Sequence, residues 1–170
     1  NYGAEETMYT SSYPGYNGHI ALRFDLAASG FGVGNRLGAA SLRVYYQSCT
    51  SPGPITNTIT VYGLQDGTDQ EGTPGPMAND GWNEVTNAVY GEAGITWNNQ
   101  PSGAYTMLGT FTVTNYTFGW HTFTSVPLLS FLNDDSNGLV TMKLISNNLG
   151  RDFFYAREAA SGWYAPQLYV

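Results

Sequence analysis

Hydrophobic and polar residues alternate strictly along residues 20–26, with the sequence IALRFDL. Four large apolar side chains fall on one face, and Ala21, Arg23 and Asp25 fall on the other. This period of two predicts a β-strand with one face against a core. Burial of the apolar face would contribute about 6–12 kcal/mol before conformational entropy is subtracted. We therefore expect residues 20–26 to form a central strand.

The same alternation recurs along the rest of the chain. In residues 40–48 it places Leu42, Val44 and Tyr46 on one face, with Arg43 and Tyr45 on the other. Further strands are predicted at residues 7–11, 58–64, 105–114, 121–125, 139–146, 153–157 and 167–170. Turn residues between residues 7–11 and 20–26 predict that these two strands form a hairpin with a long loop.

Helical signals are confined to one short segment. Residues 127–132 are predicted to form a helix, with Pro127 in its first turn and Ser125 as its N-cap. Residues 66–94 are rich in turn residues and predict a long loop. Eight or nine short strands with one short helix favour an all-β, antiparallel jelly-roll β-sandwich. Residues 1–170 are predicted to form one such domain.

Composition narrows the classes of function. A net charge of −7 argues against nucleic acid and anionic membranes as partners, and no apolar run is long enough for a membrane helix. The single cysteine, Cys49, excludes an internal disulfide. A start at Asn1 indicates a processed or excised piece, and the low charge with abundant Tyr, Thr and Gly favours a secreted or cell-surface protein. Asn115 begins a glycosylation sequon, a triplet that also occurs often by chance.

Several segments, in order, resemble one family. They are NYG (1–3), IALRFDL (20–26), GAASLRVYY (38–46), ITVYGL (59–64), WNE (82–84), ITWNNQP (95–101), the strand and helix of 120–132, GLVTMKL (138–144), FYAREAA (154–160) and PQLYV (166–170). Together they resemble the DNRLRE, or disaggregatase-related, family of surface modules, which includes polysaccharide-binding modules found beside alginate-degrading enzymes. The resemblance implies a jelly roll, a non-catalytic role and an extracellular setting.

The chain departs from the family pattern at its start. Members of the family usually carry a further strand before the NYG motif, and this sequence begins at that motif. One interpretation is an arbitrary chain start. The other is a sheet edge left open, which a strand from a neighbouring copy would fill.

Recognised catalytic motifs are absent from the sequence, so we expect no enzymatic activity. The two histidines, His19 and His121, flank or lie within predicted strands and are expected to be packed or solvated. The carboxylates of Glu5-Glu6 and Asp134-Asp135 are adjacent in sequence, so in a strand each pair would face opposite sides.

Aromatic residues in turns are the main candidates for ligand binding. Sugar rings present apolar C–H faces that stack on flat aromatic side chains. Tyr13 and Tyr16 lie in one turn, and Trp163 and Tyr164 lie in another, where side chains are usually exposed. The alternative is that these rings cover the ends of the sandwich.

Charged residues suggest two further sites. Arg23, Asp25, Arg157 and Glu158 would form either a polar platform for an acidic sugar or ion pairs that set strand register. The acidic side chains of Asp66, Asp69 and Glu71 are candidate calcium ligands, with Asp134, Asp135 and Asn137 as a weaker second set. The alternative for both loops is turn residues that cap their own backbone.

The sequence therefore favours a non-catalytic extracellular module that binds polysaccharide through exposed aromatic side chains. The alternative is a structural or adhesive subunit of the cell surface or of a filament, polymerising with copies of itself by strand exchange. Neither hypothesis includes nucleic acid binding or membrane insertion.

Overall fold

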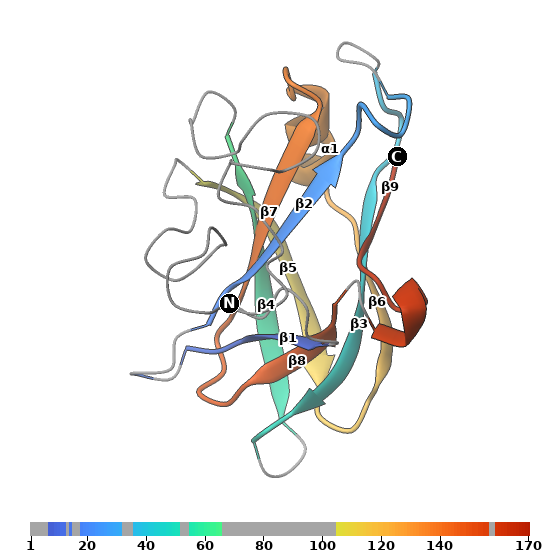
Figure 1. Cartoon of the computed structure of the whole chain (residues 1–170). Coiled ribbons are helices and arrows are strands. Elements are labelled where there is room, and N and C mark those ends of the chain that lie inside the picture. Colours follow the sequence, from blue (N-terminus) through green and yellow to red (C-terminus); the bar gives the residue numbers. More distant parts are fainter. Residues whose placement is uncertain are drawn as a thin grey trace, which may run out of the picture.

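Two antiparallel β-sheets pack face to face in the computed structural model (Figure 1). The structure describes residues 7–12, 14, 18–31, 36–51, 55–65, 105–156 and 159–170. The five-stranded sheet contains β1 (Thr7–Thr10), β8 (Asp152–Tyr155), β3 (Ser41–Cys49), β6 (Gly119–Phe123) and β9 (Gln167–Tyr169). The four-stranded sheet contains β2 (Ile20–Asp25), β7 (Leu139–Ser146), β4 (Thr56–Leu64) and β5 (Tyr105–Thr114).

The strand orders are those of a jelly roll. The five-stranded sheet runs β1-β8-β3-β6, with β9 also paired to β3, and the four-stranded sheet runs β2-β7-β4-β5. Every pair of neighbouring strands is antiparallel. The predicted fold class, an all-β antiparallel sandwich with one short helix, is confirmed.

Strand β3 lies in the interior of its sheet and pairs with three strands, β6, β8 and β9. The predicted alternation is confirmed along its length: Leu42, Val44 and Tyr46 are fully buried, whereas Arg43 and Tyr45 are only half-buried. The inward side chains contact the core, so the outward ones lie on the exposed face of the five-stranded sheet.

Strand β2 buries the predicted face but does not occupy the predicted position. Ile20, Leu22 and, just after the strand, Leu26 are buried, whereas Phe24 is half-buried and packs against the core. Among the described strands, however, β2 stands at the end of the order β2-β7-β4-β5, so the prediction of a central strand was wrong. One-sided burial occurs in both edge and central strands, so alternation alone does not distinguish them.

The predicted hairpin between the first two strands was also wrong. Strand β1 pairs with β8 and β2 pairs with β7, so they belong to different sheets. Among the described residues, an isolated bridge between Ser11 and Gly18 joins the segments that follow β1 and precede β2, and Thr10 Oγ1 donates to the carbonyl of Gly18 at 3.0 Å. Turn residues predict a change of direction, but not whether the chain returns to the same sheet.

Helix α1 (Val126–Asn133) lies at one end of the sandwich (Figure 1) and confirms the helix predicted at residues 127–132. Its N-cap is Ser125, whose Oγ accepts from the backbone N–H of Leu128 at 2.9 Å. The same hydroxyl donates to the carbonyl of Leu108 in β5 at 2.7 Å. The cap therefore also ties the helix to the four-stranded sheet. Leu128 and Leu132 point into the core.

A buried carboxylate joins the two sheets. Asp152 in β8 is fully buried, and its oxygens accept from Asn57 Nδ2 in β4 at 2.7 Å and from Ser146 Oγ in β7 at 2.5 Å. Tyr46 in β3 donates its hydroxyl to the same group at 3.4 Å. Burial and the charge of Asp152 both raise the pKa of Tyr46, so this tyrosine remains a neutral donor.

Helix α1 also packs closely against the sheet at one glycine. A Cβ atom on Gly63 in β4 would lie 2.6 Å from Cε2 and Cζ of Phe131. The phenyl ring therefore occupies the space that any larger residue at position 63 would need.

We expect Gly63→Ala to lower the free energy of unfolding by about 1–3 kcal/mol, because the added methyl group would overpack the interface with Phe131. Urea denaturation measures the effect. Gly38→Ala is the matched control, since no atom lies within 4 Å of a Cβ at that position. Equal stability of the two variants would contradict the prediction.

Candidate functional site

Four aromatic side chains meet on the outer face of the five-stranded sheet. We call Tyr45, Trp120, Tyr155 and Tyr164 the aromatic platform. Tyr45 in β3 lies opposite Trp120 in β6, with ring centroids 5.4 Å apart and planes at 78°. The ring of Tyr155 in β8 lies 5.4 Å from that of Tyr45 on the other side. Neighbouring strands thus bring together side chains that are far apart in sequence.

Tyr164 completes the platform from the segment that precedes β9. Its ring centroid is 4.5 Å from that of Tyr45 and 5.0 Å from that of Tyr155, and it is nearly parallel to the latter at 18°. Its ring is also 6.5 Å from that of Trp120. These separations are typical of aromatic pairs that stabilise one another. All four side chains are half-buried, so each keeps part of its surface open to solvent.

Polar groups border the platform on one side. The guanidinium carbon of Arg43 lies 4.5 Å from the Trp120 ring centroid and 5.7 Å from that of Tyr169. Arg43 donates to the Tyr169 hydroxyl at 3.3 Å, and that hydroxyl donates to Gln167 Oε1 at 2.7 Å. Aromatic faces and hydrogen-bonding groups therefore lie beside one another.

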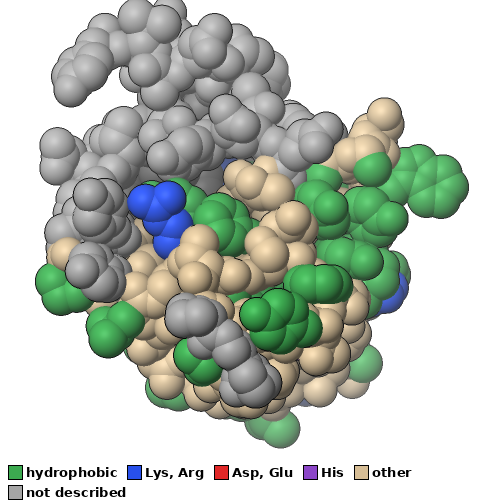
Figure 2. Space-filling model, turned by 90° about the horizontal axis from the view of Figure 1, so that it is seen from below, with side chains coloured by type: hydrophobic (Ala, Val, Ile, Leu, Met, Phe, Trp, Pro, Cys, Tyr) green, Lys and Arg blue, Asp and Glu red, His purple; other side chains and the backbone are tan. Residues whose placement is uncertain are grey.

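Trp163 precedes the platform residue Tyr164 and is 79% exposed. The three residues before it all adopt positive φ: Ala160 at 47°, Ser161 at 57° and Gly162 at 90°. Left-handed backbone costs a non-glycine residue about 1–2 kcal/mol. The turn thus holds a large apolar side chain in solvent at the border of the platform. Figure 2 shows hydrophobic side chains gathered on the right, the side where β3, β6 and β9 lie in Figure 1.

Two of the four aromatic residues predicted to bind ligand lie among the residues that the structure describes. Tyr164 belongs to the platform and Trp163 lies beside it, whereas Tyr13 and Tyr16 lie outside the described residues. The prediction missed Tyr45, Trp120 and Tyr155. The signal for Tyr45 was present, because alternation placed it on the outward face of its strand.

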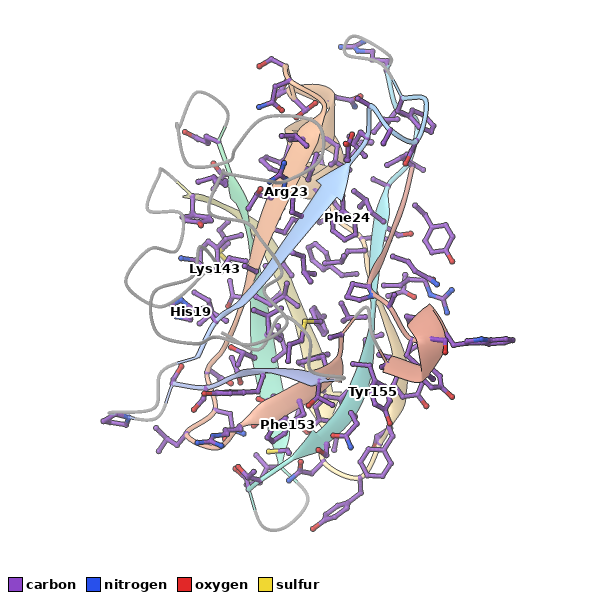
Figure 3. All side chains as sticks on the ribbon, in the orientation of Figure 1. His19, Arg23, Phe24, Lys143, Phe153 and Tyr155 are labelled. Carbon is purple, nitrogen blue, oxygen red and sulfur yellow. The ribbon has the colours of Figure 1, made fainter. Side chains whose placement is uncertain are left out.

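The two described residues of the predicted polar platform lie apart from the aromatic platform, in the other sheet. Arg23 and Asp25 lie in β2 of the four-stranded sheet, where Figure 3 labels Arg23, whereas Tyr155 lies in the five-stranded sheet. Asp25 Oδ1 accepts from the backbone of Ala28 at 2.8 Å and so caps the following turn. Arg157 and Glu158 lie outside the described residues.

The first calcium candidate, Asp66, Asp69 and Glu71, also lies outside the described residues. In the second, Asp135 accepts from the backbone N–H of Gly138 at 2.8 Å, and Asn137 accepts from that of Leu139 at 2.7 Å. These contacts are those of turn residues that cap their own backbone. In the part of the chain that the structure describes, no three His, Cys, Asp or Glu side chains cluster as metal ligands would.

His121 faces inward from β6 and packs against aromatic rings. Its ring lies 5.9 Å from that of Tyr46 and 6.1 Å from that of Phe111. This is the packed environment expected for a histidine within a strand. Burial lowers the pKa of His121 below its ordinary value, outweighing hydrogen bonds with the backbone of Thr117 and Thr112.

Comparison with protein-family models and with curated proteins finds no match to this chain. Within the described ranges, no helix has both the length and the apolar character needed to cross a membrane.

We expect His121 to make the free energy of unfolding fall as the pH drops below about 6.5, the ordinary pKa of histidine. The unfolded chain binds a proton there, whereas folded His121 binds it only at lower pH, so acid favours unfolding. Urea denaturation of the wild type and of His121→Gln across this range measures the effect. The variant should show the shallower pH dependence, and identical pH profiles would contradict the assignment.

Proposed function

We propose that the chain is a non-catalytic module that binds polysaccharide on the aromatic platform. The observation that carries the proposal is the contact of four aromatic rings from three strands and one turn on the outer face of a sheet. Side chains on an outer face do not build the core of the sandwich. A cluster of partly exposed aromatic rings on such a face is typical of a ligand-binding site.

The chemistry of the platform suits sugars. The C–H faces of pyranose rings stack on tyrosine and tryptophan, and these rigid side chains lose little entropy on binding. Contacts among the platform rings hold them in place before the ligand arrives, which lowers the cost of binding. Arg43, Gln167 and Tyr169 supply hydrogen-bonding groups beside the rings for sugar hydroxyls.

The remaining parts of the proposal rest on sequence. The ordered resemblance to the DNRLRE family supports a polysaccharide ligand, a secreted or cell-surface setting and the absence of catalysis. The platform itself contains tyrosines and a tryptophan, with arginine and glutamine beside it. The proposal is therefore one of binding without bond cleavage.

We expect Trp120→Ala to weaken polysaccharide binding by about tenfold, because a stacked ring contributes about 1.4 kcal/mol. Affinity electrophoresis in gels containing neutral or uronate-rich polysaccharides, one polymer per gel, measures the effect. Phe118→Ala is the matched control, since Phe118 is an exposed aromatic outside the platform. Thermal unfolding confirms that both variants fold.

Two results would contradict the proposal. One is a wild-type protein that no polysaccharide in the panel retards. The other is a Trp120→Ala variant that binds as well as Phe118→Ala.

The second candidate is a surface or filament subunit that polymerises by strand exchange. The observation that favours it is the position of the first two strands, since β1 and β2 each stand at the end of a sheet order among the strands that the structure describes. The end strand of a sheet is where an added strand pairs through its backbone. On this hypothesis a neighbouring copy would extend one of the two sheets.

The two candidates differ in expected size in solution. Strand exchange predicts oligomers whose mass grows with protein concentration, whereas polysaccharide binding by a separate module predicts a constant mass of 18.5 kDa. Sedimentation velocity over a hundredfold concentration range measures the difference. A constant monomer mass would contradict strand exchange.

A further inference from the structure

A second aromatic pair lies on the same face as the platform. Tyr9 in β1 is in register with Phe153 in β8, and their ring centroids are 5.8 Å apart. The guanidinium carbon of Arg151 lies 4.9 Å from the Tyr9 ring centroid. This arrangement repeats the one at the far side of the platform, where Arg43 lies over Trp120.

Strand β8 makes the two clusters continuous. Phe153 and Tyr155 are two residues apart, so both point to the outer face, while Phe154 between them is buried in the core. Figure 3 labels both outward residues. Phe153 belongs to the second pair and Tyr155 to the platform, so aromatic side chains follow one face from β1 through β8 and β3 to β6.

The ring of Tyr9 packs directly against the backbone of Gly18. A Cβ atom on Gly18 would lie 2.6 Å from Cε2 of Tyr9, so the phenol ring rests directly on this glycine. The bridge between Ser11 and Gly18 holds the glycine beside the end of β1. The position of the ring therefore depends on a residue without a side chain.

The length of this face determines what it can bind. Neighbouring strands lie about 4.8 Å apart, so the three steps from β1 to β6 span about 14 Å. This distance exceeds the width of a single sugar ring. An arginine stacked on an aromatic ring occurs at both ends of the face, and a repeated arrangement of this kind matches a ligand that is itself a repeat.

We infer that the binding site extends from the aromatic platform to Tyr9 and Phe153, and that it takes several consecutive units of a linear polysaccharide lying across the strands. The inference rests on the proposed function and adds its binding mode. The platform alone binds short oligosaccharides, and the Tyr9–Phe153 pair adds affinity only when the ligand is long enough to reach it.

Isothermal titration calorimetry with size ladders of cello-, manno-, xylo- and uronate oligosaccharides, from monosaccharide to hexasaccharide, tests this. The wild type should bind hexasaccharides at least tenfold more tightly than disaccharides of the same ladder. Tyr9→Ala should lose about tenfold in affinity for the hexasaccharide and little for the disaccharide. Trp120→Ala should weaken binding of both.

Arg151→Ala is the second variant, since it removes the guanidinium stacked on Tyr9 and leaves the rings in place. It should show the same selective loss for the longer ligand. Phe118→Ala controls for loss of an exposed ring that belongs to neither cluster. Near-ultraviolet circular dichroism verifies that every variant keeps its aromatic packing.

The inference is overturned if hexasaccharides bind no more tightly than disaccharides. It is also overturned if Tyr9→Ala and Arg151→Ala lower the affinity for disaccharides and hexasaccharides equally, or lower neither affinity. Either result would leave polysaccharide binding by the platform intact, provided that Trp120→Ala still weakens it. Failure of every ladder to bind would instead remove the proposed function, and the inference with it.

Discussion

The alternation of side chains along β3 decides which residues of the five-stranded sheet face the core and which face solvent. Leu42, Val44 and Tyr46 point inward and are buried, so Arg43 and Tyr45 must point outward. A shift of one residue would exchange the two sets, placing a guanidinium in the core. The energy that buries one face therefore also positions the side chains of the other. The packing of the core therefore also sets the positions of the platform side chains that the strands carry.

Strand β8 depends on the same principle but is anchored by polar contacts. It has only four residues, and two of them, Phe153 and Tyr155, point outward. The inward residues are Phe154, which packs in the core, and Asp152, whose carboxylate accepts from donors in the other sheet. A buried charge is stable when such hydrogen bonds surround it, and removing one donor is costly. These contacts hold the short strand, and with it the centre of the aromatic face.

Sequence periodicity predicts the elements well because it reports on burial. The inward faces of β2 and β3, the helix at residues 127–132 and its cap at Ser125 all follow from local pattern. The position of β2 at the end of its sheet, within the described residues, does not follow from it, because strand pairing joins segments that are distant in sequence. The contact of Tyr45 with Trp120 depends on the register of β3 and β6, which no local signal encodes. Trp163 and Tyr164 are neighbours in one turn, yet Trp163 is exposed and Tyr164 packs against Tyr45 and Tyr155 within the platform.

If the outer face of the five-stranded sheet binds polysaccharide, the surroundings of its aromatic rings change when the ligand is added. Nuclear magnetic resonance tests this most directly, by following the chemical shifts of aromatic and methyl groups as polysaccharide is added. We expect the ring signals of Tyr45, Trp120 and Tyr164 to shift, while the methyl signals of Leu42 and Val44 on the inner face stay unchanged. Shifts confined to β2, or none with any polysaccharide, would contradict binding at this face.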